Sequence, residues 1–511
     1  MEPYLSRRKF LISSLLLLPP YRFLAGVMTE EPYFRHGVAS GDPLQDRVII
    51  WTRISDVNAA GKEVRWEAAT DDRFRDVIRS GSIAVSASAD DTVKVDVTGL
   101  QAGTIYYYRF KYKDRYSPAG CTRTLPDRLD SQSFRIGVVS CNNWEDGYFN
   151  AFRFLAGKKE VDLVLHLGDY IYEYGTGEYG DISIGRINDP HHELITLQDY
   201  RKRYALYRTD PDLQLLHARK PFYAIWDDHE IANDSYMDGA KNHQEGEGPW
   251  TERRTAAVQA YLEWMPVRAK NAAEMKRKIS IGKEVDILFP EERLQGRTKQ
   301  VNEEDPEFYN KERHLLGDAQ AQWLKDSLKK SKATWKLIAN QVMFTGYAVA
   351  DKGKVPKYND WWVGYPYERK GMIDFLKNET TGNVIFLTGD HHQSFVLALH
   401  DEPEWMKYTK TYKEKPLAWE LLTPSITSKN ADRLEKGQIA ALEAMLGDEH
   451  VNPHLKYVDV KSHGYYIVSV SKEQLIADYY FVDNLRSRAA NESKAASFII
   501  DAEHFTIQNH E

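Results

Sequence analysis

The chain has 511 residues, which is long enough for more than one hydrophobic core. Its composition, 42% hydrophobic and 28% charged, excludes a disordered or collagen-like chain. The formal net charge of -7 gives no basic surface for duplex nucleic acid, so an anionic substrate would have to be held locally, by metal ions or by a few basic side chains.

The first 28 residues carry the pattern of an export signal. Arg7 and Arg8 precede a short apolar run at 12–19, which is typical of a twin-arginine signal peptide more than of an ordinary secretory signal. The run is far shorter than the roughly 20 residues that span a bilayer. We therefore expect residues 1–28 to engage the twin-arginine translocase. The mature chain should be a monomer without stable membrane insertion, located in the periplasm or outside the cell.

Residues 33–125 are predicted to form an N-terminal β-sandwich. Short, partly alternating runs rich in β-branched and aromatic residues stand at 46–52, 64–68 and 105–110, with turn residues between them. The turn at 100–104 leads into the last run as in a fibronectin-type strand. Because the region holds few candidate catalytic groups, we interpret it as an accessory domain.

Residues 132–485 are predicted to form an α/β catalytic domain. Near-continuous apolar runs predict strands that are buried on both faces, at 134–140, 161–167, 222–226, 335–339 and 384–388. Helical patterns alternate with them, at 149–159, 253–265, 319–330 and 371–377. Two further strands are predicted at 463–470 and 475–482.

Two stretches fit neither pattern. Residues 174–196 are rich in Gly, Asp and His, and residues 401–452 are charged and partly helical. Long insertions inside a compact domain are often lids or binding loops. For the second stretch a solvated surface excursion is an equal alternative. Arg201, Arg203 and Arg208, which follow the first stretch, are expected on a solvated helix face.

Side chains that bind cations follow four of the predicted strands. They are Cys141, then Asp169 with Tyr172, Asp228 with His229, and Asp390 with His392. The carboxyl ends of strands in open α/β sheets converge on one crevice, where such groups would repel one another or stay unsatisfied without a metal ion. Hydrolysis of a phosphate ester uses two metal ions about 3.5–4 Å apart, bridged by a carboxylate. Asp169 is the candidate bridge.

Two of these residues keep open alternatives when taken alone. His229, flanked by acids, is a candidate to protonate the leaving alkoxide, or else it only orients Asp228. Cys141 by itself is more simply a buried structural thiol. A bridge between Cys121 and Cys141 is also open in an exported protein.

Together the motifs resemble the metallophosphoesterase (calcineurin-like) signature and, more closely, the PhoD-type alkaline phosphatases. Besides the twin-arginine start, the resemblance is carried in order by 34–43, 139–141, 168–173, 226–230, 364–369, 389–392 and 452–457. Asp228 stands where the superfamily commonly has Asn, and Asp390 where it commonly has His. Val363 replaces the Asp of the family's Asp-Gly-Tyr. The resemblance implies a four-layer α/β/β/α metallophosphoesterase domain preceded by a small fibronectin III-like sandwich.

The resemblance also implies a ferric ion with calcium beside it. The iron ligands would be Cys141, Asp169, Tyr172 and His392. Thiolate and phenolate are poor ligands for Ca²⁺ but good ones for Fe³⁺, whereas the carboxylates of Asp228 and Asp390 suit calcium. Further candidate metal ligands are Asn233 and Asp360.

The sequence therefore predicts an exported, metal-dependent alkaline phosphatase or phosphodiesterase that releases phosphate from a small phosphate ester. A phospholipase D-like or nucleotide-directed phosphodiesterase on the same metal centre is the alternative. A third hypothesis is an exported fibronectin-like adhesin that has lost catalysis. The metal-binding side chains kept at four strand ends argue against the adhesin.

Overall fold

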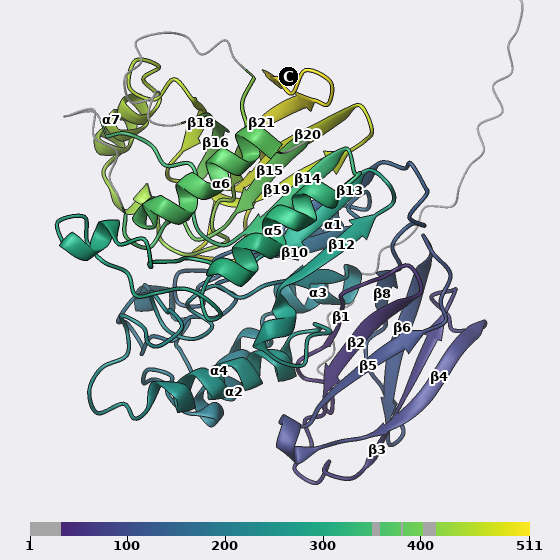
Figure 1. Cartoon of the computed structure of the whole chain (residues 1–511). Helices are drawn as coiled ribbons and strands as arrows, with labels where there is room; N and C mark the ends of the chain where they lie inside the picture. The colour runs from purple at the N-terminus through teal and green to yellow at the C-terminus, as the bar shows by residue number, and fades with distance from the viewer. Residues whose placement is uncertain (1–31, 350–357, 380–381, 402–414, 511) are drawn as a thin grey trace, which may run out of the picture.

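Three β-sheets and seven α-helices make up the described part of the chain in the computed structural model (Figure 1). It describes residues 32–349, 358–379, 382–401 and 415–510, so the signal peptide predicted at 1–28 lies outside it. The helices of these ranges are all too short or too polar to cross a bilayer. The predicted α/β class is confirmed at this level.

The ten-stranded sheet has three parallel strands at its centre, β9 (Phe134–Val139), β10 (Leu163–His166) and β11 (Phe222–Ala224). Antiparallel strands extend it on the β9 side: β19 (His463–Val470), β20 (Gln474–Val482), β21 (Glu492–Asp501) and β22 (Ile507–Asn509). The predicted strands are confirmed, but the sheet continues beyond residue 485, where the sequence suggested that the domain ends. The first half of β21 is polar or small and has no buried residue, so it gave no strong core signal.

The seven-stranded sheet carries four parallel strands, β13 (Val285–Phe289), β14 (Trp335–Asn340), β15 (Asn383–Thr388) and β17 (Ala418–Leu422). Its antiparallel members are β12 (Arg277–Ile281), β16 (Ser394–Leu399) and β18 (Leu455–Asp459). Strand β17 corrects the interpretation of 401–452 as a lid or surface excursion, because Ala418–Leu422 within this stretch is a fully buried strand. A charged residue, Glu420, sits within it, and its carboxylate accepts backbone N–H bonds from Phe344 and Thr345.

Helices pack on the outer faces of the two sheets, and the inner faces share one core. The helices are α1 (Asn150–Gly157), α2 (Leu197–Tyr207), α3 (Pro211–Arg219), α4 (Trp250–Trp264), α5 (Asp318–Lys330), α6 (Pro366–Glu379) and α7 (Lys436–Leu446). The four predicted helices are confirmed as α1, α4, α5 and α6. Helices α5 and α6 lie over the seven-stranded sheet (Figure 1), and their Leu324 and Ile373 belong to the same buried cluster as Phe386 of β15. Ile385 on its other face belongs to the same buried core as Ile136 of the ten-stranded sheet.

The N-terminal region contributes strands to two sheets. The five-stranded sheet holds β3 (Glu63–Ala69), β4 (Val77–Ala84), β6 (Ile105–Tyr112), β7 (Arg115–Tyr116) and β8 (Gly120–Arg123). It shares a core with β1 (Val38–Gly41), β2 (Arg47–Arg53) and β5 (Thr92–Thr98). These last three strands belong to the ten-stranded sheet, because Gly41 of β1 pairs in parallel with Phe222 of β11. The N-terminal unit is therefore joined to the catalytic region through a sheet.

The segments that follow β9, β10, β11 and β15 meet at one place. The Cys141 N–H donates to the carbonyl of Gly168 at 3.1 Å, and Ser140 bridges to Ser425, beyond β17. A Cβ added at Gly168 would lie 2.4 Å from Cβ of Asp227, so the loops after β10 and β11 are in contact. This convergence brings the predicted metal ligands together.

Candidate metal centre

Four of the predicted ligands lie on backbone of left-handed conformation. The φ angles of Cys141, Asp169, Asp390 and His392 are 61°, 57°, 61° and 63°. This conformation costs an L-residue roughly 1–2 kcal/mol. Such strain is typical of functional sites, where the surrounding structure enforces it. Here each strained residue follows a buried strand and turns its side chain toward the shared edge of the sheets.

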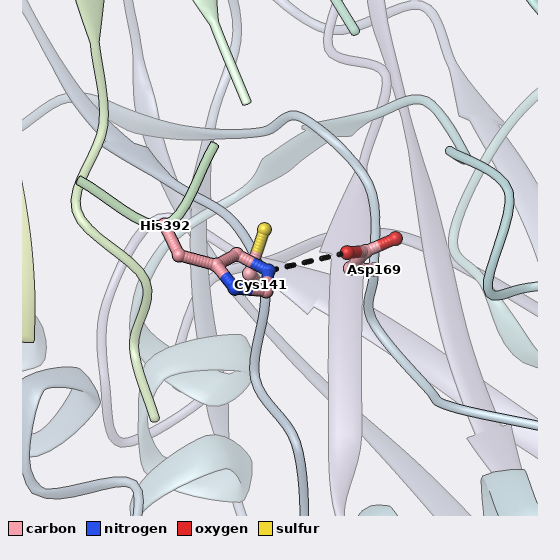
Figure 2. Close-up of side chains that lie close together, drawn as sticks. All are labelled: Cys141, Asp169 and His392. Atoms are coloured by element: carbon pink, nitrogen blue, oxygen red, sulfur yellow. Dashed lines mark ion pairs between the residues drawn. The ribbon is translucent and has the colours of Figure 1, made fainter. Parts of the chain in front are cut away.

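One cluster combines sulfur, oxygen and nitrogen donors. Cys141, Asp169 and His392 each offer one ligand atom, and these atoms lie within 4.8 Å of one another (Figure 2). The Tyr172 hydroxyl donates to Asp169 Oδ2 at 2.9 Å and lies 3.3 Å from His392 Nε2. His392 Nδ1 donates to the Lys429 carbonyl at 2.9 Å, which leaves Nε2 facing the cluster. Cys141 and Cys121 are both free thiols.

Two further acidic clusters adjoin the first. Asp169, Asp228 and His229 form one, and Asp227, Asp228 and Asp390 form the other. Asp169 is shared by the first and second clusters and Asp228 by the second and third, so the clusters make one continuous row. The sequence analysis assigned a role to Asp228 but none to its neighbour Asp227. The signal was present, since both residues follow β11 in a loop, where consecutive side chains can face the same side.

The chemistry of these residues fits bound cations. Asp169 Oδ1, Asp227 Oδ2 and Asp228 Oδ1 are buried and have no hydrogen-bond partner among the described residues. A buried carboxylate oxygen without a partner is costly, and a cation would supply one. Burial raises the pKa of the Cys141 thiol well above its usual value, and the charge of Asp169 adds to this effect. Burial and the charge of Asp360 raise the pKa of Asp390 to about 7. A metal ion would favour the ionised form of both groups.

His229 is held by a buried carboxylate that the sequence analysis did not assign. Its Nδ1 lies 2.8 Å from Glu173 Oε2, which leaves Nε2 for the centre. The other oxygen of Glu173 accepts hydrogen bonds from Asn233 N at 2.7 Å and Asn242 Nδ2 at 2.8 Å. Burial lowers the pKa of His229, but the charges of Asp228, Asp169 and Glu173 outweigh it and raise this pKa well above the usual value. These charges favour the protonated imidazole, which donates through Nδ1 to Glu173.

The two further candidates differ in their surroundings. Asn233 follows His229 and is anchored through its backbone N–H, which donates to Glu173 Oε1 at 2.7 Å. Asp360 accepts from Arg293 Nη1 at 2.9 Å to both oxygens, and also from Arg297 and from Gln300 Nε2. Its carboxylate is thus already paired with arginine. Arg293 was not singled out from the sequence, because it lies after β13 in a segment without a recognisable motif.

The arginines expected on a solvated helix face are mostly buried. Arg203 and Arg208 are fully inaccessible, and Arg201 pairs with Glu263 at 2.6 Å. Arg203 donates to the carbonyls of Tyr172 and Tyr174 in the loop that follows β10. The prediction was wrong because this loop packs on α2 and its carbonyl groups need donors there.

Aromatic rings border the centre on two sides. Tyr172 stacks on His229 with ring centroids 4.3 Å apart, and Tyr174 stacks on Tyr179 at 5.0 Å. Tyr174 and Tyr179 belong to the stretch 174–196. On the other side Trp361 Nε1 donates to Asp390 Oδ2 at 3.1 Å. The stretch 174–196 therefore contributes side chains beside His229, as expected for a binding loop.

Comparison with known families adds the class of the protein. The family model for the PhoD-like phosphatase matches residues 136–479, and the model for the N-terminal domain of the same family matches residues 24–126. With this fold and this cluster, the chain is a hydrolase of phosphoric esters. It belongs to the PhoD-like phosphatase family.

Two relatives support this assignment over nearly the whole chain. Alkaline phosphatase D of Bacillus subtilis (strain 168) is 36% identical over 486 residues, which cover 91% of this chain and 80% of the relative. A solved structure titled as that of PhoD superposes with a TM-score of 0.84 at 34% identity, covering 94% of this chain and 92% of the other.

Proposed function

We propose that the chain is an exported, metal-dependent alkaline phosphatase or phosphodiesterase that releases phosphate from small phosphate esters. The observation that carries the proposal is the cluster of Cys141, Asp169 and His392 with Tyr172. Thiolate, phenolate, carboxylate and imidazole together form a donor set for ferric iron. When bound, Fe³⁺ and Ca²⁺ would neutralise the phosphoryl oxygens and supply a hydroxide nucleophile at moderate pH.

The proposed ligands divide between the two metals. Cys141, Asp169, Tyr172 and His392 hold iron, and Asp169 also faces the neighbouring acidic clusters. Asp228 and Asp390 offer hard oxygen donors for calcium. Asn233 is the outer candidate for calcium, because Asp360, the other residue considered, already accepts hydrogen bonds from two arginines.

His229 is the proposed general acid. Glu173 fixes its Nδ1, so that the proton on Nε2 faces the centre. As the P–O bond to the leaving group breaks, this proton passes to the departing oxygen and the alcohol leaves neutral. Asp228 contributes to catalysis by its charge, which favours the protonated imidazole.

A second candidate is a nucleotide-directed or phospholipase D-like phosphodiesterase on the same centre. It is favoured by the stacked Tyr174 and Tyr179 beside His229, which offer a flat apolar surface where a leaving group departs. Rates with p-nitrophenyl phosphate, its bis-ester, a nucleotide diester and phosphatidylcholine distinguish the candidates. Faster turnover of the monoester than of all three diesters would eliminate the second.

The finer features of the fold and location belong to the same proposal. The catalytic region corresponds to a four-layer α/β/β/α domain that starts near residue 132 and continues past residue 485 through β21 and β22. Residues 33–125 correspond to a fibronectin III-like unit that shares strands with its main sheet. Residues 1–28 direct export by the twin-arginine translocase to the periplasm or beyond, where the chain acts as a monomer. A fusion of residues 1–28 to a reporter tests the export route, since Arg7→Lys with Arg8→Lys should retain the reporter in the cytoplasm.

Metal analysis of the exported protein tests the centre. We expect about one iron per chain together with calcium. Cys141→Ser should lose most of the iron, and kcat/KM should fall by about 100-fold or more, because a direct ligand is removed. Cys121→Ser is the matched control, since this second free thiol lies outside the cluster. An iron-free but active wild type, or Cys141→Ser with full iron content, would refute the assignment.

A further inference from the structure

Arg293 is a fully buried arginine placed among four carboxylates. Its Nε contacts Asp227 Oδ1, and its Nη1 binds both oxygens of Asp360 at 2.9 Å. Its Nη2 lies 3.5 Å from Asp228 Oδ1 and 3.6 Å from Asp390 Oδ1. Nη2 is therefore ion-paired with Asp228 and Asp390 but too far from either for a hydrogen bond. It has no hydrogen-bond partner among the described residues.

The loop that carries Arg293 is itself anchored. The backbone N–H of Arg293 donates to Glu291 Oε1 at 3.1 Å, and the same oxygen accepts from Trp226 Nε1 at 2.8 Å. Glu292 accepts the backbone N–H groups of Gln341 and Val342 at 3.0 and 2.9 Å. The backbone that carries Arg293 is thus anchored to the segments that follow β11 and β14, by contacts separate from the acids that its guanidinium meets.

Charge balance indicates what the guanidinium does there. When all four carboxylates are ionised, the form that a bound cation would favour, they meet two guanidinium groups, Arg293 and Arg297, because Arg297 also pairs with Asp360. Two negative charges remain, which one divalent cation would balance. Without Arg293 the buried acids would repel one another strongly whenever no metal ion was bound. The rigid fork of arginine can hold several carboxylates at once, which the single ammonium of lysine cannot.

We propose that Arg293 is a positioning residue that serves as a permanent internal cation of the acidic cluster. It pairs with Asp227 and Asp360 as a scaffold and holds Asp228 and Asp390 together in the metal-free chain, ready for a divalent cation. Asp360 then acts through arginine instead of as an open metal ligand. This inference rests on the proposed metal-dependent function.

The test measures how strongly Ca²⁺ stabilises the folded protein. Mature wild type, Arg293→Gln, Arg293→Lys and Arg186→Gln are stripped with EDTA and titrated with CaCl₂ while the melting temperature is followed. A cation that binds only the folded state raises this temperature. We expect Arg293→Gln to melt lowest without calcium and to gain at least about twice the wild-type rise with it. Arg293→Lys should gain an intermediate amount.

Arg186→Gln is the control for the loss of any buried arginine. Arg186 pairs with Asp210 at 2.8 Å, and neither residue belongs to the metal clusters. Its removal should therefore lower the melting temperature without enlarging the calcium-dependent rise. An Arg293→Gln protein that is soluble only when refolded with CaCl₂ also supports the proposal. An equal calcium-dependent rise in wild type and Arg293→Gln, or insolubility with and without CaCl₂, overturns it. Wild type that shows no bound metal and no rise would instead refute the proposed function.

Discussion

At the scale of single residues, the pair of Glu173 and His229 governs the proton that the site can deliver. The carboxylate is completely buried and spends both oxygens on fixed partners, one of them His229 Nδ1. Because Nδ1 is engaged with Glu173, Nε2 is the ring nitrogen of His229 that is left to carry a proton toward the metal centre.

Replacing Glu173 with Gln should shift the pH dependence of the reaction. The change removes one of the charges that raise the pKa of His229, so this pKa falls. Because a general acid works only while protonated, activity is lost as the pH rises through this pKa. The alkaline limb of the kcat/KM profile should move to lower pH, which steady-state rates across the alkaline range would detect.

The control for this prediction is His229→Asn. It removes the acid itself and should lower kcat by about 10²–10⁴-fold while abolishing the limb. A substrate with a good leaving group, such as a nitrophenyl ester, should suffer less. An unmoved limb in Glu173→Gln would show that another group titrates there.

How far the sequence defines the site also depends on individual residues. The pattern of strand ends brought together Cys141, Asp169, Asp228 and Asp390, because the ends of buried strands necessarily converge. Arg293 was missed since its partners lie in three other segments, and such contacts exist only once the chain is folded.

At the scale of elements, the turn after β10 sets the spacing between Asp169, which ends that turn, and Asp227 in the loop after β11. Gly168 has φ of 107°, and a Cβ there would lie 2.4 Å from Cβ of Asp227 and 2.6 Å from its nitrogen. The loops after β10 and β11 approach this closely only because residue 168 has no side chain.

Gly168→Ala should separate these loops and weaken the centre. We expect a lower metal content and a free energy of unfolding reduced by about 1–3 kcal/mol, from strain and overpacking. Metal analysis and denaturant unfolding measure the two effects. Gly185→Ala is a suitable control, since Gly185 also has positive φ but no atom within 4 Å of the added Cβ. Equal effects in both variants would argue against a role of loop spacing.

Elements were predictable where one signal dominated. Long apolar runs gave β9, β10, β14 and β15, whereas β17 was missed because a short strand with a central Glu resembles loop sequence. Its Glu420 is tolerated because the carboxylate accepts hydrogen bonds from two backbone N–H groups and from Thr388 Oγ1, which are tertiary contacts.

At the scale of the whole molecule, the N-terminal unit completes the main sheet. Strand β1 covers the edge of β11, and Trp51 of β2 donates to the Glu263 carbonyl at 2.8 Å. Arg208 lies over the Trp51 ring at 4.2 Å. The sequence predicted two units from a change in strand pattern, but alternation within strands could not reveal that a sheet runs between them.

A chain of residues 126–511 should therefore fail to fold into a soluble monomer. Removing the N-terminal unit exposes the edge of β11 and the apolar surface around α4, and both exposures favour aggregation. Size-exclusion chromatography of the soluble fraction measures the outcome. Deletion of 507–511, which removes only the short edge strand β22, is the control and should stay monomeric. A soluble, active 126–511 fragment would contradict this view.

The left-handed backbone at Cys141, Asp169, Asp390 and His392 has a consequence for any attempt to improve this enzyme by selection for heat resistance. Glycine adopts that conformation without steric cost, so glycine at each position would relieve roughly 1–2 kcal/mol of strain while deleting a metal-binding group. Screens that reward folding alone would therefore favour loss of the centre. At these four positions the residue that would stabilise the fold would also remove a metal-binding group, so only a screen for catalysis retains the present side chains.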